Sequence, residues 1–156
     1  MSSQSGHNSL ASQSQSVGSN MELSISIRSD VNSISPLVDK LMMIIKGCNC
    51  VPEQEEEVEV AVREALANAV VHGNQQNAGK RVYIRCRIQF GELLIIVKDE
   101  GTGFDPTNLA DPTDVANINS THGRGIYLMR ALMDDVQFEQ GGTEVHLRKS
   151  SSNRNR

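Results

Sequence analysis

Residues 63–73, with the sequence REALANAVVHG, carry a polar side chain at every fourth position of an otherwise apolar segment. The polar residues are Glu64, Asn68 and His72. Residues four apart on a helix are one turn apart and are offset by only about 40° around the axis. The segment therefore predicts a helix with a polar column along the edge of its apolar stripe, where it would border a pocket. For Glu64 and Asn68 taken alone, a solvated helix edge is the alternative.

The same helical repeat extends towards the N-terminus. Pro52 and Glu53 are expected to begin the helix, with acidic residues 53–57 near the positive end of its dipole, and Gly73 is expected to end it. The apolar positions between them follow the i, i+3, i+4, i+7 rule of a buried face: Val58, Ala61, Val62, Ala65, Leu66 and Ala69.

The rest of the chain supplies strands and two further helices. One helix should be capped by Asp30, Ser33 or Ser35 and end near Gly47, and another should span residues 123–136. Alternating or continuous apolar runs predict strands at 23–29, 81–88, 92–99, 136–140 and 143–149. This order predicts an α+β fold, a two-layer α/β sandwich with helices on one face of a mostly antiparallel mixed sheet.

Length and composition limit the possible classes of protein. The 156 residues suit one domain, expected at 21–149, between a disordered Ser/Gln-rich tail at 1–20 and a disordered basic tail at 150–156. A net charge of -4 argues against broad attraction to nucleic acid or acidic membranes. No apolar run approaches the ~20 residues of a membrane span, and no secretory leader is expected. Cys48, Cys50 and Cys86 are expected to be free thiols in a reducing cytoplasm.

Two glycine-containing motifs accompany the polar column. Asp99-Glu100-Gly101-Thr102-Gly103 follows an apolar strand, so that a carboxylate would stand beside glycines past which the backbone can approach a planar group. A calcium loop would need further oxygen ligands. Residues 123–125 (Gly-Arg-Gly) open a helix, whose N-terminal N–H groups favour an anion. Neither motif has the spacing of a Walker loop or of a Rossmann fingerprint.

Together the three motifs resemble the boxes of the GHKL ATP-binding superfamily, whose members share the Bergerat fold. Within it, the chain is most similar to anti-sigma-factor serine kinases, and the resemblance spans roughly Leu23 to Lys149. Residues 64–74 (EALANAVVHGN) resemble the N box, 99–104 (DEGTGF) the G1 box and 122–136 (HGRGIYLMRALMDDV) the G2 box. Gly142-Thr143 matches a Gly-Thr pair in the strand behind the nucleotide.

The resemblance implies a role for each matching residue, with ATP and Mg²⁺ as cofactors. Asn68 would hold the Mg²⁺, Glu64 would be the general base, and Asp99 would accept a hydrogen bond from the adenine amino group. The backbone at Gly101 and Gly103 would approach the base, and Thr143 would contact the adenine side. His72 is expected to be structural or helix-ending.

The G2 box would bind the phosphates. Gly123 and Gly125 would cradle them beside His122, and the loop from Phe104 to His122 would be the ATP lid. Some relatives carry a basic residue just before the G2 glycines, where this chain has Ser120 and Thr121. The charge of the γ-phosphate would therefore be left to Arg124, or that role would be vacant.

The function implied is that of a serine/threonine protein kinase that is also an anti-sigma factor. It would phosphorylate a small anti-anti-sigma (STAS-type) protein and sequester a sigma factor, possibly as a homodimer. Two alternatives are a non-catalytic ATP-gated protein-binding module and the ATP-binding subunit of a split phosphorelay histidine kinase. An α+β domain with coincidental glycines is the remaining interpretation.

Overall fold

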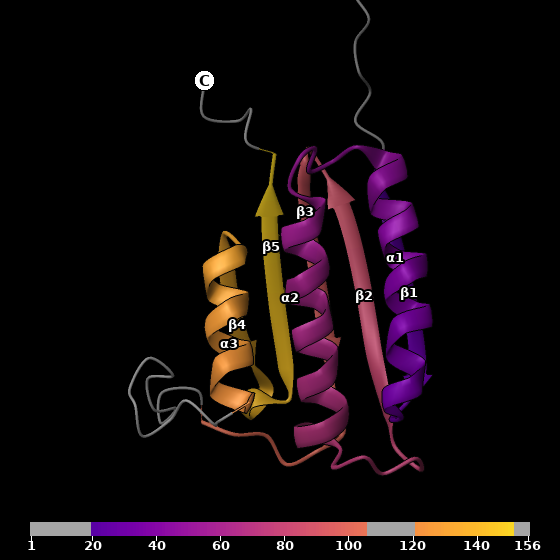
Figure 1. Ribbon diagram of the computed structural model, residues 1–156, viewed down its shortest axis with the longest axis vertical. Helices are drawn as coiled ribbons and strands as arrows, with labels where there is room; N and C mark the ends of the chain where they lie inside the picture. Colours follow the sequence, from indigo (N-terminus) through magenta and orange to yellow (C-terminus); the bar gives the residue numbers. More distant parts are fainter. Residues whose placement is uncertain (1–19, 106–120, 152–156) are drawn as a thin grey trace, which may run out of the picture.

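A computed structural model describes residues 20–105 and 121–151. Within them, three helices cover one face of a five-stranded sheet (Figure 1), so the predicted α+β sandwich is confirmed. The helices are α1 (Ile34–Cys48), α2 (Glu55–Ala67) and α3 (Thr121–Leu132). The strands are β1 (Met21–Arg28), β2 (Arg81–Gln89), β3 (Glu92–Lys98), β4 (Asp135–Glu139) and β5 (Glu144–Ser150).

The sheet has the order β1-β2-β3-β5-β4, and each neighbouring pair of these described strands is antiparallel. The sheet is therefore antiparallel throughout rather than mixed. β3 lies at its centre, as its unbroken apolar run predicts. A tight turn joins β2 to β3, in which Phe90 and Gly91 both have positive φ, of 51° and 73°. Positive φ at both central residues is the geometry that matches the twist of a two-residue hairpin.

The core lies between the helices and the sheet. Alternate residues of β2 are buried, because successive side chains of a strand point to opposite faces. The predicted apolar stripe of α2 is buried as well, which confirms the period that defined the helix. Valine, isoleucine, leucine and methionine fill this core, including Leu41, Ile45, Leu66, Ile95 and Met129.

α1 ends near Gly47 as predicted, whereas α2 begins later than predicted. The Asp30 carboxylate accepts the N–H of Asn32 and so caps a short 3-10 turn (Val31–Ser33) that leads into α1. Gly47 lies within the last turn of α1, which Asn49 ends in the left-handed conformation with φ 48°. α2 begins at Glu55 rather than at Pro52-Glu53, because Glu53 has a φ of 68°, which a right-handed helix excludes.

The later elements are also shifted. α3 spans Thr121–Leu132 rather than 123–136, and the residues from Asp135 onwards belong to β4 instead. β5 runs to Ser150, one residue beyond the predicted domain limit. The predictions for residues 1–19 and 152–156, and for 106–120 of the lid, lie outside the described residues. No helix in the described part has the length and apolarity to span a membrane.

Candidate functional site

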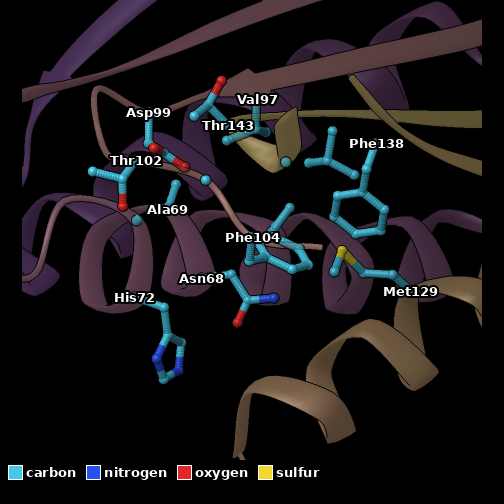
Figure 2. A pocket seen from close by; sticks show the side chains of 15 residues that line it. Asn68, Ala69, His72, Val97, Asp99, Thr102, Phe104, Met129, Phe138 and Thr143 are labelled. Atoms are coloured by element: carbon cyan, nitrogen blue, oxygen red, sulfur yellow. The ribbon is translucent and has the colours of Figure 1, made fainter. Parts of the chain in front are cut away.

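The helix that carries the N box changes geometry at Asn68. α2 ends at Ala67 and continues as a π-helical turn, Asn68–Gly73, that Gly73 ends as predicted. The N–H of Asn74 closes this turn on the carbonyl oxygen of Ala69 at 2.8 Å. Single π turns occur frequently at functional sites, where they re-aim side chains. Asn68 and His72 project from the same side of the turn (Figure 2), as the polar column requires.

A cavity of about 230 Å³ lies beside this turn. Asp99 and Thr102 stand at one end of it and Phe138 and Met129 at the other (Figure 2). The ring centroids of Phe104 and Phe138 are 5.2 Å apart in an edge-to-face arrangement. The other lining residues are Ala65, Asn68, Ala69, His72, Gly73, Val97, Gly103, Gly142, Thr143 and Val145. One acidic group in largely apolar walls suits a planar ring with a single polar edge.

Asp99 is that acidic group. Its side chain is 8% exposed, and burial raises the pKa of its carboxyl above the ordinary 3.8, while the Gly101 N–H and the charge of Lys80 act in the opposite direction. The Gly101 N–H donates to Asp99 Oδ1 at 2.8 Å. The Asp99 N–H donates to the Thr143 carbonyl oxygen at 2.9 Å, so the residue just before β5 holds the backbone from which the carboxylate projects.

The glycines of the G1 box make close backbone contacts. Gly103 has a φ of 78°, and a Cβ there would overlap the Gly141 carbonyl oxygen. A Cβ at Gly101 would overlap the Gly73 carbonyl oxygen, so the G1 box packs directly on the end of the N box. Gly103 lines the cavity, whereas Gly101 supports its wall.

Thr143 also lies at the cavity, but it precedes β5 rather than lying within it. Its hydroxyl donates to the Gln140 carbonyl oxygen at 2.9 Å. This bond belongs to the tight turn that holds the backbone of Thr143 beside Asp99. The Thr143 hydroxyl therefore already donates its proton within the protein, and the predicted contact with adenine would have to use this engaged side chain.

The G2 glycines lie inside α3 rather than before it. Gly123 is the third residue of the helix and lies in its first turn, whereas Gly125 is the fifth. A Cβ at Gly125 would lie 2.7 Å from Glu64 Oε2 and 3.5 Å from both side-chain polar atoms of Asn68. The N and G2 boxes therefore meet at Gly125, where a Cβ would displace the Glu64 carboxylate.

Arg124 and His122 are the other G2 residues with a predicted role at the phosphates. Arg124 is exposed, on the first turn of α3. His122 belongs to the same turn, and the contacts predicted for its side chain lie outside the described residues. The predicted lid begins at Phe104, which lines the cavity, and continues into residues 106–120.

The sequence alone did not single out the apolar walls or Asn74. Phe138 faces the cavity from β4, and its alternation with exposed neighbours was the available signal. Arg130 stands 5.8 Å from the Phe138 ring centroid, close enough for a cation–π contact. Asn74 ends the N box and is 1% exposed, and both polar atoms of its side chain are hydrogen-bonded.

The fold and the three converging boxes define a histidine kinase-like ATPase domain. The chain belongs to that family, which it matches over residues 27–149. It is 33% identical over 111 residues to the anti-sigma F factor of Bacillus thuringiensis (strain Al Hakam) and, equally, to that of Bacillus mycoides (strain KBAB4). The aligned segment covers 67% of this chain and 76% of each relative. The family assignment made from the boxes is confirmed.

Proposed function

We propose that the chain binds ATP with Mg²⁺ and transfers the γ-phosphoryl group to a serine or threonine of a partner protein. The observation that carries this proposal is the meeting of three boxes around one cavity. Asp99 lies at its buried end, and Glu64 and Asn68 lie against Gly125 of α3. The adenine ring would enter between the apolar walls, and the phosphates would extend towards the N-terminal turn of α3.

The adenine contact rests on the chemistry of Asp99. When it is ionised, a buried carboxylate beside apolar walls accepts hydrogen bonds and carries no proton with which to donate one. It would pair with the exocyclic amino group of adenine and would repel the oxygen that guanine carries at that position. Burial raises the pKa of this carboxyl, and a donor bound to it would act in the opposite direction by stabilising the ionised form.

The residues present also fit a magnesium ion. The Nδ2 atom of Asn68 is buried and has no hydrogen-bond partner, although buried amide groups are normally paired. A phosphate oxygen would accept from Nδ2, and Oδ1 would be the metal ligand. Within the described residues, no group of three His, Cys, Asp or Glu side chains could hold a metal. That agrees with Mg²⁺, which takes few protein ligands and binds mainly to water and phosphate oxygens. When bound, the ion would neutralise charge on the phosphates.

Glu64 is proposed as the general base for the acceptor hydroxyl. It lies on α2 one turn before Asn68, with its carboxylate beside the first turns of α3. There it would accept the proton that a serine or threonine hydroxyl loses as its oxygen attacks the γ-phosphorus. Arg124, exposed on the adjacent turn, is proposed to face the γ-phosphate.

The partners are proposed from the similarity to anti-sigma F factors. The acceptor would be a small anti-anti-sigma (STAS-type) protein, and a sigma factor would be the protein that the kinase sequesters. The possible homodimer and the cytoplasmic location stay predictions.

A transfer assay with γ-labelled ATP, Mg²⁺ and the candidate anti-anti-sigma protein tests the proposal. Glu64→Gln should lower the transfer rate by about 10²–10⁴-fold, the usual contribution of a general base, with little change in ATP affinity. Glu59→Gln, also on α2, is the matched control and should leave the rate unchanged. Equal rates for Glu64→Gln and the unaltered protein would reject the assigned base.

The same assay separates the two alternatives. A non-catalytic module would bind its partner only with ATP and leave it unlabelled. A split phosphorelay kinase would give a label on histidine that acid removes, whereas phosphoserine and phosphothreonine survive acid. Retention of label after acid therefore supports the proposed acceptor chemistry.

A further inference from the structure

We propose that Asn74 is a positioning residue that aims Asp99 at the purine and thereby sets the selectivity for the exocyclic amino group. This inference rests on the proposed ATP site. Asn74 follows the π turn directly and is not itself one of the residues that line the cavity. Its effect would be exerted through the backbone on either side of it.

The side chain of Asn74 joins two segments that are distant in sequence. Its Nδ2 group donates to the Arg81 carbonyl oxygen at 2.9 Å, at the start of β2. Its Oδ1 atom accepts the N–H of Glu100 at 2.8 Å, at the residue after Asp99. Because the backbone N–H of Asn74 also closes the π turn, one residue links that turn, β2 and the G1 box.

A third hydrogen bond links Arg81 directly to Glu100. The Arg81 N–H donates to Glu100 Oε1 at 2.6 Å. Asn74, Arg81 and Glu100 thus form a closed set of hydrogen bonds on one side of Asp99. On the other side, the Asp99 N–H is bonded to Thr143. Hydrogen bonds on both sides therefore hold the backbone of Asp99, and the Gly101 N–H holds the Oδ1 atom of its carboxylate at the cavity.

The packing next to Asn74 makes Asp99 sensitive to small shifts. A Cβ on Gly73 would overlap the Asp99 carboxylate, so the backbone of Gly73 forms the wall against which that carboxylate rests. Displacing Asn74 would move both Gly73 and Glu100, the residues that bracket the carboxylate. Protein interiors are close-packed, and a shift of this kind is transmitted to the neighbouring atoms.

The chemistry of an amide explains why this position needs asparagine. The site presents one backbone acceptor and one backbone donor to a buried side chain, and an amide satisfies both at once. An apolar side chain would leave the Arg81 carbonyl and the Glu100 N–H unpaired. An aspartate would keep the acceptor for Glu100 and lose the donor for Arg81.

Selectivity is the measurement that a purely structural role would not change. The affinities of the full chain for ATP and for purine riboside triphosphate, which lacks the exocyclic amino group, are compared with Mg²⁺ present, and each variant's melting temperature is recorded. In the unaltered protein, ATP should bind at least about tenfold more tightly, as expected for a hydrogen bond to a charged acceptor. Equal affinity there, or no binding, would reject the proposed ATP site and this inference with it.

Three variants then test Asn74 itself. Asn74→Ala should reduce the ATP preference to about twofold or less, because it removes the acceptor for the Glu100 N–H and the donor for the Arg81 carbonyl oxygen. Glu100→Ala, on an exposed side chain, should reduce the preference part of the way. Asn77→Ala is the matched control, because the Asn77 side chain is exposed in the same turn and its Oδ1 atom accepts from the nearby Gly79 N–H, while the backbone bonds of Asn77 are kept.

Each measured preference supports or overturns the positioning role of Asn74. A folded Asn74→Ala that weakens both nucleotides by the same factor, and so keeps the preference, overturns the positioning role. If Asn74→Ala does not fold, an unchanged preference in Glu100→Ala overturns it, and a reduced one supports it.

Discussion

Gly125 of α3 lies so close to Glu64 of α2 that a Cβ on the glycine would come within 2.7 Å of the Glu64 Oε2 atom. The obstructing atom is the far end of a flexible side chain, so the carboxylate can swing away without disturbing the core. Gly125 therefore matters for where the carboxylate rests rather than for whether α3 forms.

Gly125→Ala is accordingly expected to separate stability from activity. Alanine is favoured over glycine within a helix by about 1 kcal/mol, so the melting temperature should stay the same or rise. The displaced Glu64 carboxylate should slow transfer from ATP by at least about tenfold, since a general base must stand within hydrogen-bond reach of its proton. The two quantities are measured by thermal unfolding and by the labelled-ATP assay.

Gly47→Ala is the matched control for that substitution. Gly47 lies in α1, and a Cβ there would meet no atom within 4 Å. It should gain the same helix propensity and leave the transfer rate unchanged. A normal rate in Gly125→Ala would show that the position of the Glu64 carboxylate does not limit transfer.

Lys149 should be a strong contributor to stability although it is charged. Its side chain is 6% exposed, and its Nζ group donates to Glu57 Oε2 at 2.7 Å and to the Leu132 carbonyl oxygen at the end of α3. Lys149→Met keeps the apolar volume but removes both bonds and should lower the free energy of unfolding by about 1–3 kcal/mol. Urea denaturation measures this difference.

The neighbouring residue on β5 provides the comparison. Arg148 is on the opposite face, where its side chain is 42% exposed and pairs with Glu92 at 2.9 Å. An exposed pair of this kind contributes about 0–1 kcal/mol, so Arg148→Met should change the free energy of unfolding less than Lys149→Met. A larger loss in Arg148→Met would contradict the assignment of Lys149 as the anchor of α3.

The three thiols should react at very different rates. Cys48 is exposed, whereas Cys50 and Cys86 are buried. Burial, followed by the charges of Cys50 and Cys48, raises the pKa of the Cys86 thiol to about 12, and burial also raises the pKa of Cys50. Because the thiolate is the reactive form, Ellman's reagent at about pH 8 should label one cysteine quickly in the native protein and all three in denaturant. Rapid labelling of Cys48→Ser would show that a buried thiol is accessible.

The sequence predicted the parts of the fold that depend on local periodicity. The apolar stripe of α2 and the alternation in β2 set which side chains face the core, and the structure buries those side chains. The unbroken run of β3 likewise placed that strand at the centre of the sheet. In each case burial repeats with the period of the element itself, so no knowledge of distant contacts was required.

Distant contacts decided what the sequence could not predict. The π turn at Asn68 departs from the period of α2, and its closing residue, Asn74, is held by Arg81 and Glu100 from other parts of the chain. The cavity wall formed by Phe138 depends on how β4 pairs with β5, far from the N box. These features follow from tertiary packing, which overrides local propensity.

Asp99→Asn should stabilise the protein at neutral pH while it weakens ATP binding. Burial raises the pKa of the folded carboxyl above its unfolded value of about 3.8, so the folded state holds this proton more tightly than the unfolded state. As pH rises from about 3.8 through the folded pKa, the unaltered protein loses stability, and above that pKa the loss is complete. The variant lacks this loss and keeps an oxygen that accepts from Gly101.

The excess in melting temperature of Asp99→Asn should therefore be larger at pH 7 than at pH 4, and calorimetry across this range measures it. Its affinity for ATP should fall by at least about tenfold, because the amide can present a donor to the adenine amino group. Asp39→Asn, at a side chain 74% exposed and 3.7 Å from Arg63, should show neither effect. If the melting-temperature excess of Asp99→Asn shrinks as pH rises, folding stabilises the Asp99 carboxylate instead of its protonated form. Donors of the cavity would then already satisfy the group that is proposed to bind adenine.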